Sequence, residues 1–137
     1  MSNLDEFEAF AKIENLLQSF ASAQAGYLKR AIVKDSARIY FVEVKDVDWI
    51  EAAGQGVLFH IGDEPHRSSA RLSELMPQLD PRSFVRIHRS AIVNIDRIQE
   101  LQPRGHGDYS VLMSSGAKLL LSRTYRRELE TALKQSL

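Results

Sequence analysis

The chain is organised around one stretch, Phe84-Val85-Arg86-Ile87-His88-Arg89-Ser90-Ala91-Ile92-Val93-Asn94. Its apolar and polar side chains alternate and then reach Arg89 and Ser90, which is typical of a strand that ends in a turn. Asn94 is expected to cap a short helical turn over residues 95–98. The two guanidinium groups and the imidazole are donors suited to an anion or to a base edge. They are equally consistent with charges that keep a strand edge from aggregating.

Length and composition exclude several classes of protein. The chain has 137 residues, which indicates one domain that is large enough to bury a core. It has no cysteine, so it has neither a disulfide framework nor a thiolate metal site. No apolar run approaches the roughly 18 residues of a membrane span, and the N-terminus lacks the pattern of a secretory signal. We expect a cytoplasmic protein without a membrane segment, and nothing indicates a cofactor or a bound metal.

The net charge of zero conceals an uneven distribution of charge. Residues 1–26 hold four acidic side chains against one lysine, whereas residues 27–137 hold 17 basic against 14 acidic side chains. All 12 arginines lie in the second region. Arginine is the better residue for bidentate contact with phosphate or guanine, so a nucleic-acid partner is consistent with this region.

Residues 1–26 are expected to form a segment distinct from the domain that follows. Residues 3–25 contain neither glycine nor proline and predict a helix. This helix carries an apolar seam of about two heptads, which is made by Phe10, Ile13, Leu17 and Phe20. It is either a connector or homodimerisation helix, or a helix that packs back on its own domain.

Residues 27–137 alternate short apolar runs with turn residues, which predicts a mainly β fold of the α+β class with antiparallel strands and short helices. A core stripe of leucines predicts a helix that follows Ser68 or Ser69 as its cap. Residues 103–108 are expected to be a mobile, glycine-rich hairpin tip. Strands are expected over residues 27–34, 38–44, 50–53, 57–61, 109–113 and 117–121.

The C-terminal helix is expected to begin at Ser122 as its cap, with Arg123, Arg126 and Arg127 in its first turn. The helix dipole disfavours cations at this end by about a few tenths of a kcal/mol. Free N–H groups at a helix N-terminus themselves bind phosphate. The cluster therefore indicates an anionic partner, and the alternative is that these arginines pair with Glu128, with Glu130 or with the sheet.

A third exposed turn is predicted at Gly54-Gln55-Gly56, a tight hairpin tip that presents Gln55. A glutamine there can bind adenine through two hydrogen bonds, although most such residues are ordinary turn residues. No catalytic motif accompanies these turns, and we predict that the protein is not an enzyme. A small hydrolase that used His88 would need a second catalytic group that the sequence does not show.

Together these motifs resemble the LytTR family of bacterial DNA-binding domains, over most of the chain from Tyr27. The family is typically the output half of two-component response regulators, and it reads successive major grooves with loops. The resemblance implies a sequence-specific DNA-binding transcriptional regulator. The motifs that carry it are Trp49-Ile50-Glu51-Ala52, Leu58-Phe59-His60, Phe84 to Ser90, Val93-Asn94 and Leu121-Ser122-Arg123-Thr124-Tyr125.

The resemblance also implies roles for particular residues. The three contact loops fall on Gln55, on His88-Arg89-Ser90 and on Ser122-Arg123. Arg89 and Arg123 are the expected base readers, and the expected phosphate ligands are Arg86, Arg126 and Arg127. The partner is then double-stranded DNA with promoter repeats. The alternative is a protein-interaction module whose basic edge docks an acidic partner.

A receiver domain, which the family usually carries, does not fit within 137 residues beside this domain. We therefore expect a stand-alone regulator, a fragment of a longer one, or a member with a different N-terminal input.

Overall fold

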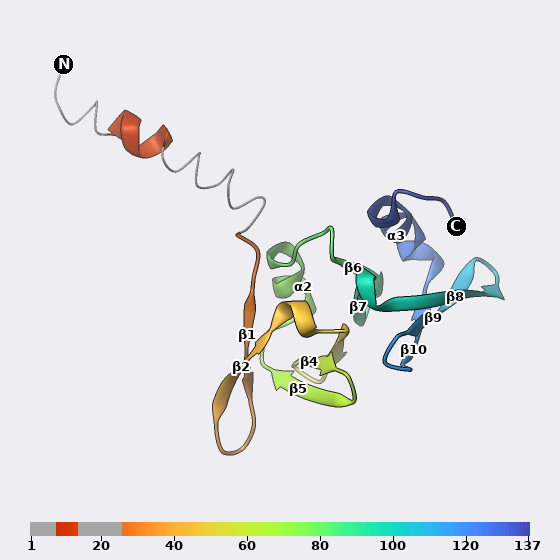
Figure 1. The fold of residues 1–137 in the computed structure, drawn as a ribbon, viewed down its shortest axis with the longest axis horizontal. Helices are drawn as coiled ribbons and strands as arrows, with labels where there is room; N and C mark the ends of the chain where they lie inside the picture. The colour runs from red at the N-terminus through yellow and green to blue at the C-terminus, as the bar shows by residue number, and fades with distance from the viewer. Residues whose placement is uncertain (1–7, 14–25) are drawn as a thin grey trace.

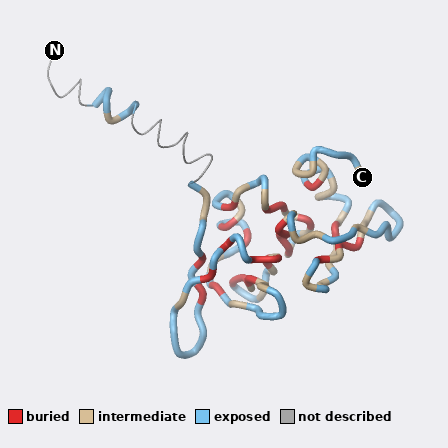
Figure 2. The backbone as a smooth tube through the Cα atoms, in the orientation of Figure 1, coloured by how far each residue is buried: buried red, intermediate tan, exposed pale blue. Residues whose placement is uncertain are grey.

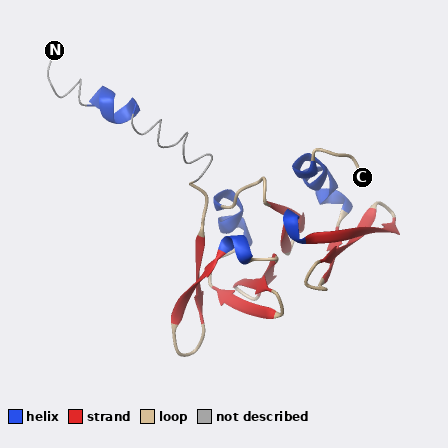
Figure 3. Cartoon of the chain, in the orientation of Figure 1, coloured by secondary structure: helices blue, strands red, loops and turns tan. Residues whose placement is uncertain are grey.

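The computed structural model describes residues 8–13 and 26–137 (Figure 1). Residues 8–13 are helical and expose Phe10 and Ile13, and the rest of the helix predicted over residues 3–25 lies outside the described residues. The described chain is mainly antiparallel β-strand with short helices, as predicted (Figure 3). No helix among the described residues is long and apolar enough to cross a membrane.

The strands form three antiparallel sheets with two, five and three strands. The first is the hairpin of β1 (Arg30–Lys34) and β2 (Ile39–Glu43). The second has the order β5-β4-β3-β7-β6 and the third the order β10-β9-β8. These eight strands are β3 (Trp49–Ala53), β4 (Gly56–Ile61), β5 (Glu64–Ser68), β6 (Phe84–His88), β7 (Ala91–Asn94), β8 (Ile98–Gly105), β9 (Asp108–Met113) and β10 (Lys118–Leu121).

The helical elements are short and lie between the strands or, at the C-terminus, after the last of them. Asn94 caps the 3-10 helix η3 (Ile95–Arg97), because its Oδ1 accepts from the Asp96 N–H at 3.1 Å; the predicted cap is confirmed. The other helical elements are η1 (Val44–Asp46), α2 (Leu72–Leu75), η2 (Met76–Gln78), η4 (Arg123–Tyr125) and α3 (Arg126–Leu133).

The five-stranded sheet is covered on both faces, and this explains why β6 and β7 are almost continuously buried (Figure 2). Phe84 and Ile92 face a core that they share with the β1–β2 hairpin and α2. Val85 and Val93 face a second core, which they share with β9, β10 and α3. In Figure 1 the hairpin therefore lies on one side of the sheet and α3 on the other.

Two boundaries in the first half of the chain differ from the prediction. Residues 64–68 form strand β5, which is absent from the predicted strands, and Pro65 is tolerated because β5 pairs only with β4 and forms the edge of its sheet. The N-cap of α2 is Arg71, without a side-chain cap, so neither Ser68 nor Ser69 has the predicted role. The Ser68 hydroxyl instead accepts from the Ala70 N–H.

Two boundaries in the second half also differ. Strand β8 continues through Pro103 to Gly105, so the loop predicted over residues 103–108 shrinks to the turn at His106 and Gly107. Ser122 occupies the N-cap position of the last helical segment, but its side chain makes no capping hydrogen bond. The segment begins as the 3-10 helix η4 and becomes α-helical only at Arg126.

A surface ion pair in the loop before β6 gives a prediction about pH. The Arg82 guanidinium donates to Asp80 Oδ2 at 2.9 Å, and this interaction lowers the pKa of Asp80 below its ordinary value of 3.8. Because the folded pKa is the lower one, the stabilisation is present above about pH 4 and is lost as the pH falls through the folded value. Urea unfolding should therefore show that wild type is more stable than Asp80→Asn at pH 6. That difference should shrink progressively as the pH falls below about 4, and a difference that stays constant over this range would contradict the assignment.

Candidate nucleic-acid interface

The first predicted contact turn lies at the tip of the β3–β4 hairpin, where Gln55 is exposed. The next residue, Gly56, lies where β4 passes the end of β5. A Cβ atom at Gly56 would stand 2.1 Å from the main-chain oxygen of Ser68, so only glycine fits there. Arg67 supports the same tip from β5, since its Nη1 donates to the Ala53 carbonyl at 3.3 Å. The tip is therefore held in one position with Gln55 outside.

The second predicted turn is Arg89-Ser90, between β6 and β7. His88 Nδ1 accepts from the Ser90 main-chain N–H at 3.2 Å and lies 2.9 Å from the Ser90 hydroxyl. An amide N–H can only donate, so Nδ1 is the unprotonated nitrogen and the neutral ring carries its hydrogen on Nε2. His88 is only partly exposed, so contact between its Nε2–H donor and a partner stays a prediction.

Arg86 braces this turn from within β6. Its guanidinium donates to the carbonyl of His88 at 3.3 Å and to the carbonyl of Arg89. It also lies 5.7 Å from the ring centroid of Tyr125 in η4. Arg86 therefore fixes the backbone that carries the exposed Arg89 side chain. A guanidinium has five donors, so contact between Arg86 and a phosphate stays a prediction.

The third predicted turn is η4, where Asp108 supplies the cap that Ser122 does not. Asp108 Oδ1 accepts from the Arg123 main-chain N–H at 3.0 Å, across 15 residues of sequence. The Arg123 side chain is exposed. Asp108 thus orients the start of the segment that presents Arg123.

Arg126 and Arg127 follow in the first turn of α3 and have different surroundings. Arg126 Nη2 donates to the main-chain oxygen of Leu137 at 2.8 Å, and its Nε lies 3.7 Å from Glu130 Oε1. Arg127 is exposed. Across residues 26–137, no ion pair ties Arg89, Arg123 or Arg127 to a carboxylate. The predicted alternative of pairing with glutamate thus applies to Arg126 alone.

Two backbone hydrogen bonds place the three turns next to one another. The Ala52 N–H donates to the Ser90 carbonyl at 2.9 Å, which joins the strand below Gln55 to the Arg89-Ser90 turn. The Ser122 N–H donates to the Ile87 carbonyl at 3.0 Å, which joins that turn to η4. The turns therefore gather at the end of the five-stranded sheet where β3 and β6 finish and β7 begins.

Sequence reasoning missed two arginines beside the first turn. Arg67 lies on β5, a strand that the sequence did not predict. Arg71 is exposed and lines a hollow of about 300 Å³ together with Gln55 and Ala52. The only signal in the sequence was the presence of two arginines, at positions 67 and 71, shortly after the glycine-rich turn. Only the pairing of β4 with β5 brings them next to that turn.

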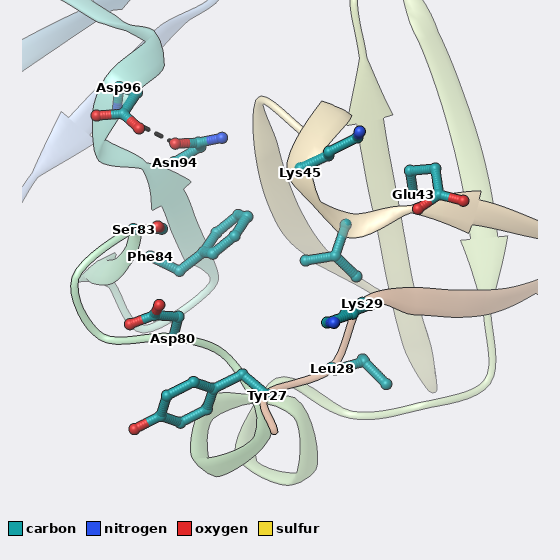
Figure 4. Close-up of a pocket in the computed structure, with 11 residues that line it drawn as sticks. Tyr27, Leu28, Lys29, Glu43, Lys45, Asp80, Ser83, Phe84, Asn94 and Asp96 are labelled. Carbon is teal, nitrogen blue, oxygen red and sulfur yellow. Dashed lines mark hydrogen bonds between the residues drawn. The ribbon is translucent and has the colours of Figure 1, made fainter. Parts of the chain in front are cut away.

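The cavity drawn in Figure 4 lies away from these turns. It has a volume of about 420 Å³ and is bordered by Phe84 and Asn94, at the end of the β6–β7 hairpin opposite its turn. Figure 4 shows Lys29, Lys45 and Glu43 on one side of it, and Asp80 and Asp96 on the other. Asn94 and Phe84 are themselves buried parts of the fold. Among the described residues, no group of three His, Cys, Asp or Glu side chains is placed to hold a metal ion.

Comparison with known families identifies the family of this chain. The family model described as the LytTr DNA-binding domain matches residues 37–134. The chain therefore belongs to the LytTR family of DNA-binding domains, as its motifs predicted. A solved LytTr DNA-binding domain from Bacillus cereus has the same fold, with a TM-score of 0.71 and 24% sequence identity over 77% of this chain and 97% of that one.

Several curated proteins are similar in sequence. The sensory transduction protein LytT of Bacillus subtilis is 29% identical over 87% of this chain and 49% of its own length. The LytT protein of Bacillus anthracis is 33% identical over 70% of this chain and 39% of its own length. The transcriptional regulatory protein LytR of Staphylococcus aureus is 22% identical over 90% and 50% of the two lengths. The chain thus spans about half, or less, of the curated relatives that it matches.

Proposed function

We propose that this protein is a sequence-specific transcriptional regulator that reads successive major grooves of DNA with its three turns. The observation that carries the proposal is the adjacency of Gln55, Arg89 and Arg123 at one end of a rigid sheet. Backbone hydrogen bonds link the strands and turns that hold these residues. The similarity to LytT and LytR supports a role as the output module of a bacterial signalling pathway, in the cytoplasm.

Arg89 and Arg123 are the proposed base readers, because their side chains are exposed on held backbones and pair with no carboxylate among the described residues. An arginine fits the O6 and N7 atoms of guanine through two hydrogen bonds. Gln55 is suited to adenine in the same way. His88, Ser90 and Ser122 are proposed to contribute donors that set the register of the protein on the duplex.

Arg86, Arg126 and Arg127 are the proposed phosphate ligands, with unequal freedom to act. Arg127 is exposed and unpaired with any described carboxylate, whereas Arg86 and Arg126 already donate to main-chain oxygens. Arg86 and Arg126 can offer only their remaining donors. Arg127 should therefore give the clearest non-specific electrostatic contribution.

Replacing Arg127 with alanine should weaken binding to a target duplex and to a random duplex by the same factor. A plot of log K against the logarithm of the salt concentration has a negative slope. Loss of one phosphate contact should make that slope less steep by about 0.9. Fluorescence anisotropy over a salt series measures both quantities. Arg38→Ala, which removes an exposed arginine that pairs with Asp35 in the β1–β2 turn, is the control and should bind like wild type. A selective loss of target binding in Arg127→Ala would instead make Arg127 a base reader.

The segment before the domain is proposed to be a connector or a dimerisation helix. Phe10 is 66% exposed and Ile13 is 57% exposed, so both are available to a helix from another chain or to an upstream domain. Sedimentation analysis of the chain with and without residues 1–25 tests the dimer. If the chain is a monomer both with and without residues 1–25, the dimerisation role is excluded and the connector role is the one that stays proposed.

The function itself is tested by selecting bound duplexes from a random library and measuring affinity for the selected sequence. Specific DNA binding is typically at least a thousandfold tighter than non-specific binding by the same protein, so a clear preference is expected. Equal affinity for selected and random duplexes would contradict sequence-specific reading. Failure to bind any duplex would favour the protein-interaction module.

A further inference from the structure

The tip of the β8–β9 hairpin, residues 104–108, packs against the turn that presents Arg123. Asp108 at the start of β9 holds the Arg123 N–H, as described above. Gly107 makes the closest approach: a Cβ atom placed on it would lie 3.4 Å from the Cβ of Arg123 and 3.9 Å from its Cδ. The Gly107 backbone has φ +82°, which disfavours any side chain there. The tip thus lies along the stem of the Arg123 side chain.

This tip carries two exposed side chains that no interaction explains. Arg104 and His106 are exposed, and neither forms an ion pair with a described carboxylate. The pairing of β8 with β9 shifts between Pro103 and Gly105, which leaves Arg104 as an extra residue in the ladder. Such bulges turn a side chain away from the sheet and are common beside functional sites.

The negative charge in the same tip does not oppose a DNA partner. Asp108 is only partly exposed and its carboxylate already accepts the Arg123 N–H at the start of a helical segment. An acceptor at that position is also favoured by the partial positive charge of the segment's N-terminus. The outward charge of the tip is therefore that of Arg104.

We propose that residues 104–108 are a fourth contact element of the DNA interface, in which Arg104 binds a phosphate beside the groove that Arg123 enters. Asp108 acts there as a positioning residue for Arg123. The inference rests on the proposed function. Double-stranded DNA carries one negative charge per about 1.7 Å of helix axis, so phosphates are closely spaced along the groove that Arg123 is proposed to enter. Arg104 is the exposed cation of the element that packs against Arg123.

Arg104→Ala tests the phosphate contact, with Arg38→Ala as the matched loss of an exposed arginine elsewhere. We expect Arg104→Ala to bind selected and random duplexes about tenfold more weakly. The slope of log K against the logarithm of the salt concentration should also become less steep by about 0.9. The Arg38→Ala control should not change either quantity. Wild-type affinity and slope in Arg104→Ala would overturn the contact while leaving the proposed function intact. If wild type itself binds no duplex, both are overturned.

Asp108→Ala and Asp108→Asn test the positioning role. Asparagine keeps the Oδ1 acceptor for the Arg123 N–H, whereas alanine removes it. Asp108→Ala should reduce the preference for the selected duplex at least fivefold, and Asp108→Asn should restore most of it. Thermal unfolding of each variant is measured alongside, to confirm that both are folded. Equal preference in folded Asp108→Ala and wild type would overturn the positioning role.

Discussion

Replacing Arg89 with alanine is expected to remove most of the preference for a selected duplex at one position of the site. A bidentate arginine–guanine contact contributes about 1–3 kcal/mol of discrimination, which is roughly a 5- to 150-fold loss of preference. Affinity for random duplexes should change far less, because the turn carries other donors to phosphate. The fold should persist, since Arg89 is exposed and its backbone is held by Arg86 and by the hydrogen bond from Ala52 to Ser90.

Competition binding with selected and random duplexes at one salt concentration measures this change. Arg127→Ala is the informative comparison, because it should lower both affinities and leave their ratio unchanged. If Arg89→Ala binds the selected duplex as tightly as wild type, Arg89 is not a base reader. If the preference is lost, duplexes that each change one base pair of the selected sequence identify the position that Arg89 reads. At that position alone, Arg89→Ala should bind the changed and the unchanged duplex equally well.

Replacing Phe59 with alanine is expected to give the largest loss of stability of any single change considered. Phe59 on β4 has no exposed surface and lies in the core between the five-stranded sheet, the β1–β2 hairpin and α2. Deleting a buried phenylalanine costs about 3–5 kcal/mol, through lost transfer free energy and the cavity left behind. A domain of this size is stabilised by only about 5–15 kcal/mol, so urea unfolding should shift strongly.

Phe41→Ala provides the same chemical change at a surface position. Phe41 on β2 is 52% exposed, so its loss should cost under about 1 kcal/mol. The midpoint of urea unfolding for the two variants, compared with wild type, gives the difference directly. Similar destabilisation by the two variants would contradict this prediction. It would mean either that Phe41 is buried in solution or that the core does not depend on Phe59.

The parts of the fold that could be predicted are those that local sequence encodes. The Asn94 cap needs only an asparagine two residues before a free N–H, and the structure has it at the predicted place. The strand that ends near His88 follows from the alternation of apolar and polar residues before it, and the motifs around Arg89 and Arg123 were enough to identify the family. These features depend on neighbours within a few residues.

The features that could not be predicted depend on contacts between distant residues. Asp108 caps η4 across 15 residues, so sequence alone favoured Ser122, which is adjacent and of the right type. Strand β5 contains Pro65, which normally excludes a strand, and only its position at the edge of the sheet permits it.

The most direct test of the account is an NMR titration of isotopically labelled protein with the selected duplex. The account predicts that the main-chain amides at Gln55, at Arg89-Ser90 and at Arg123 shift together at one stoichiometry, since these turns meet at one end of the sheet. Shifts confined to the β1–β2 hairpin around Phe41, or shifts at only one of the three turns, would contradict it.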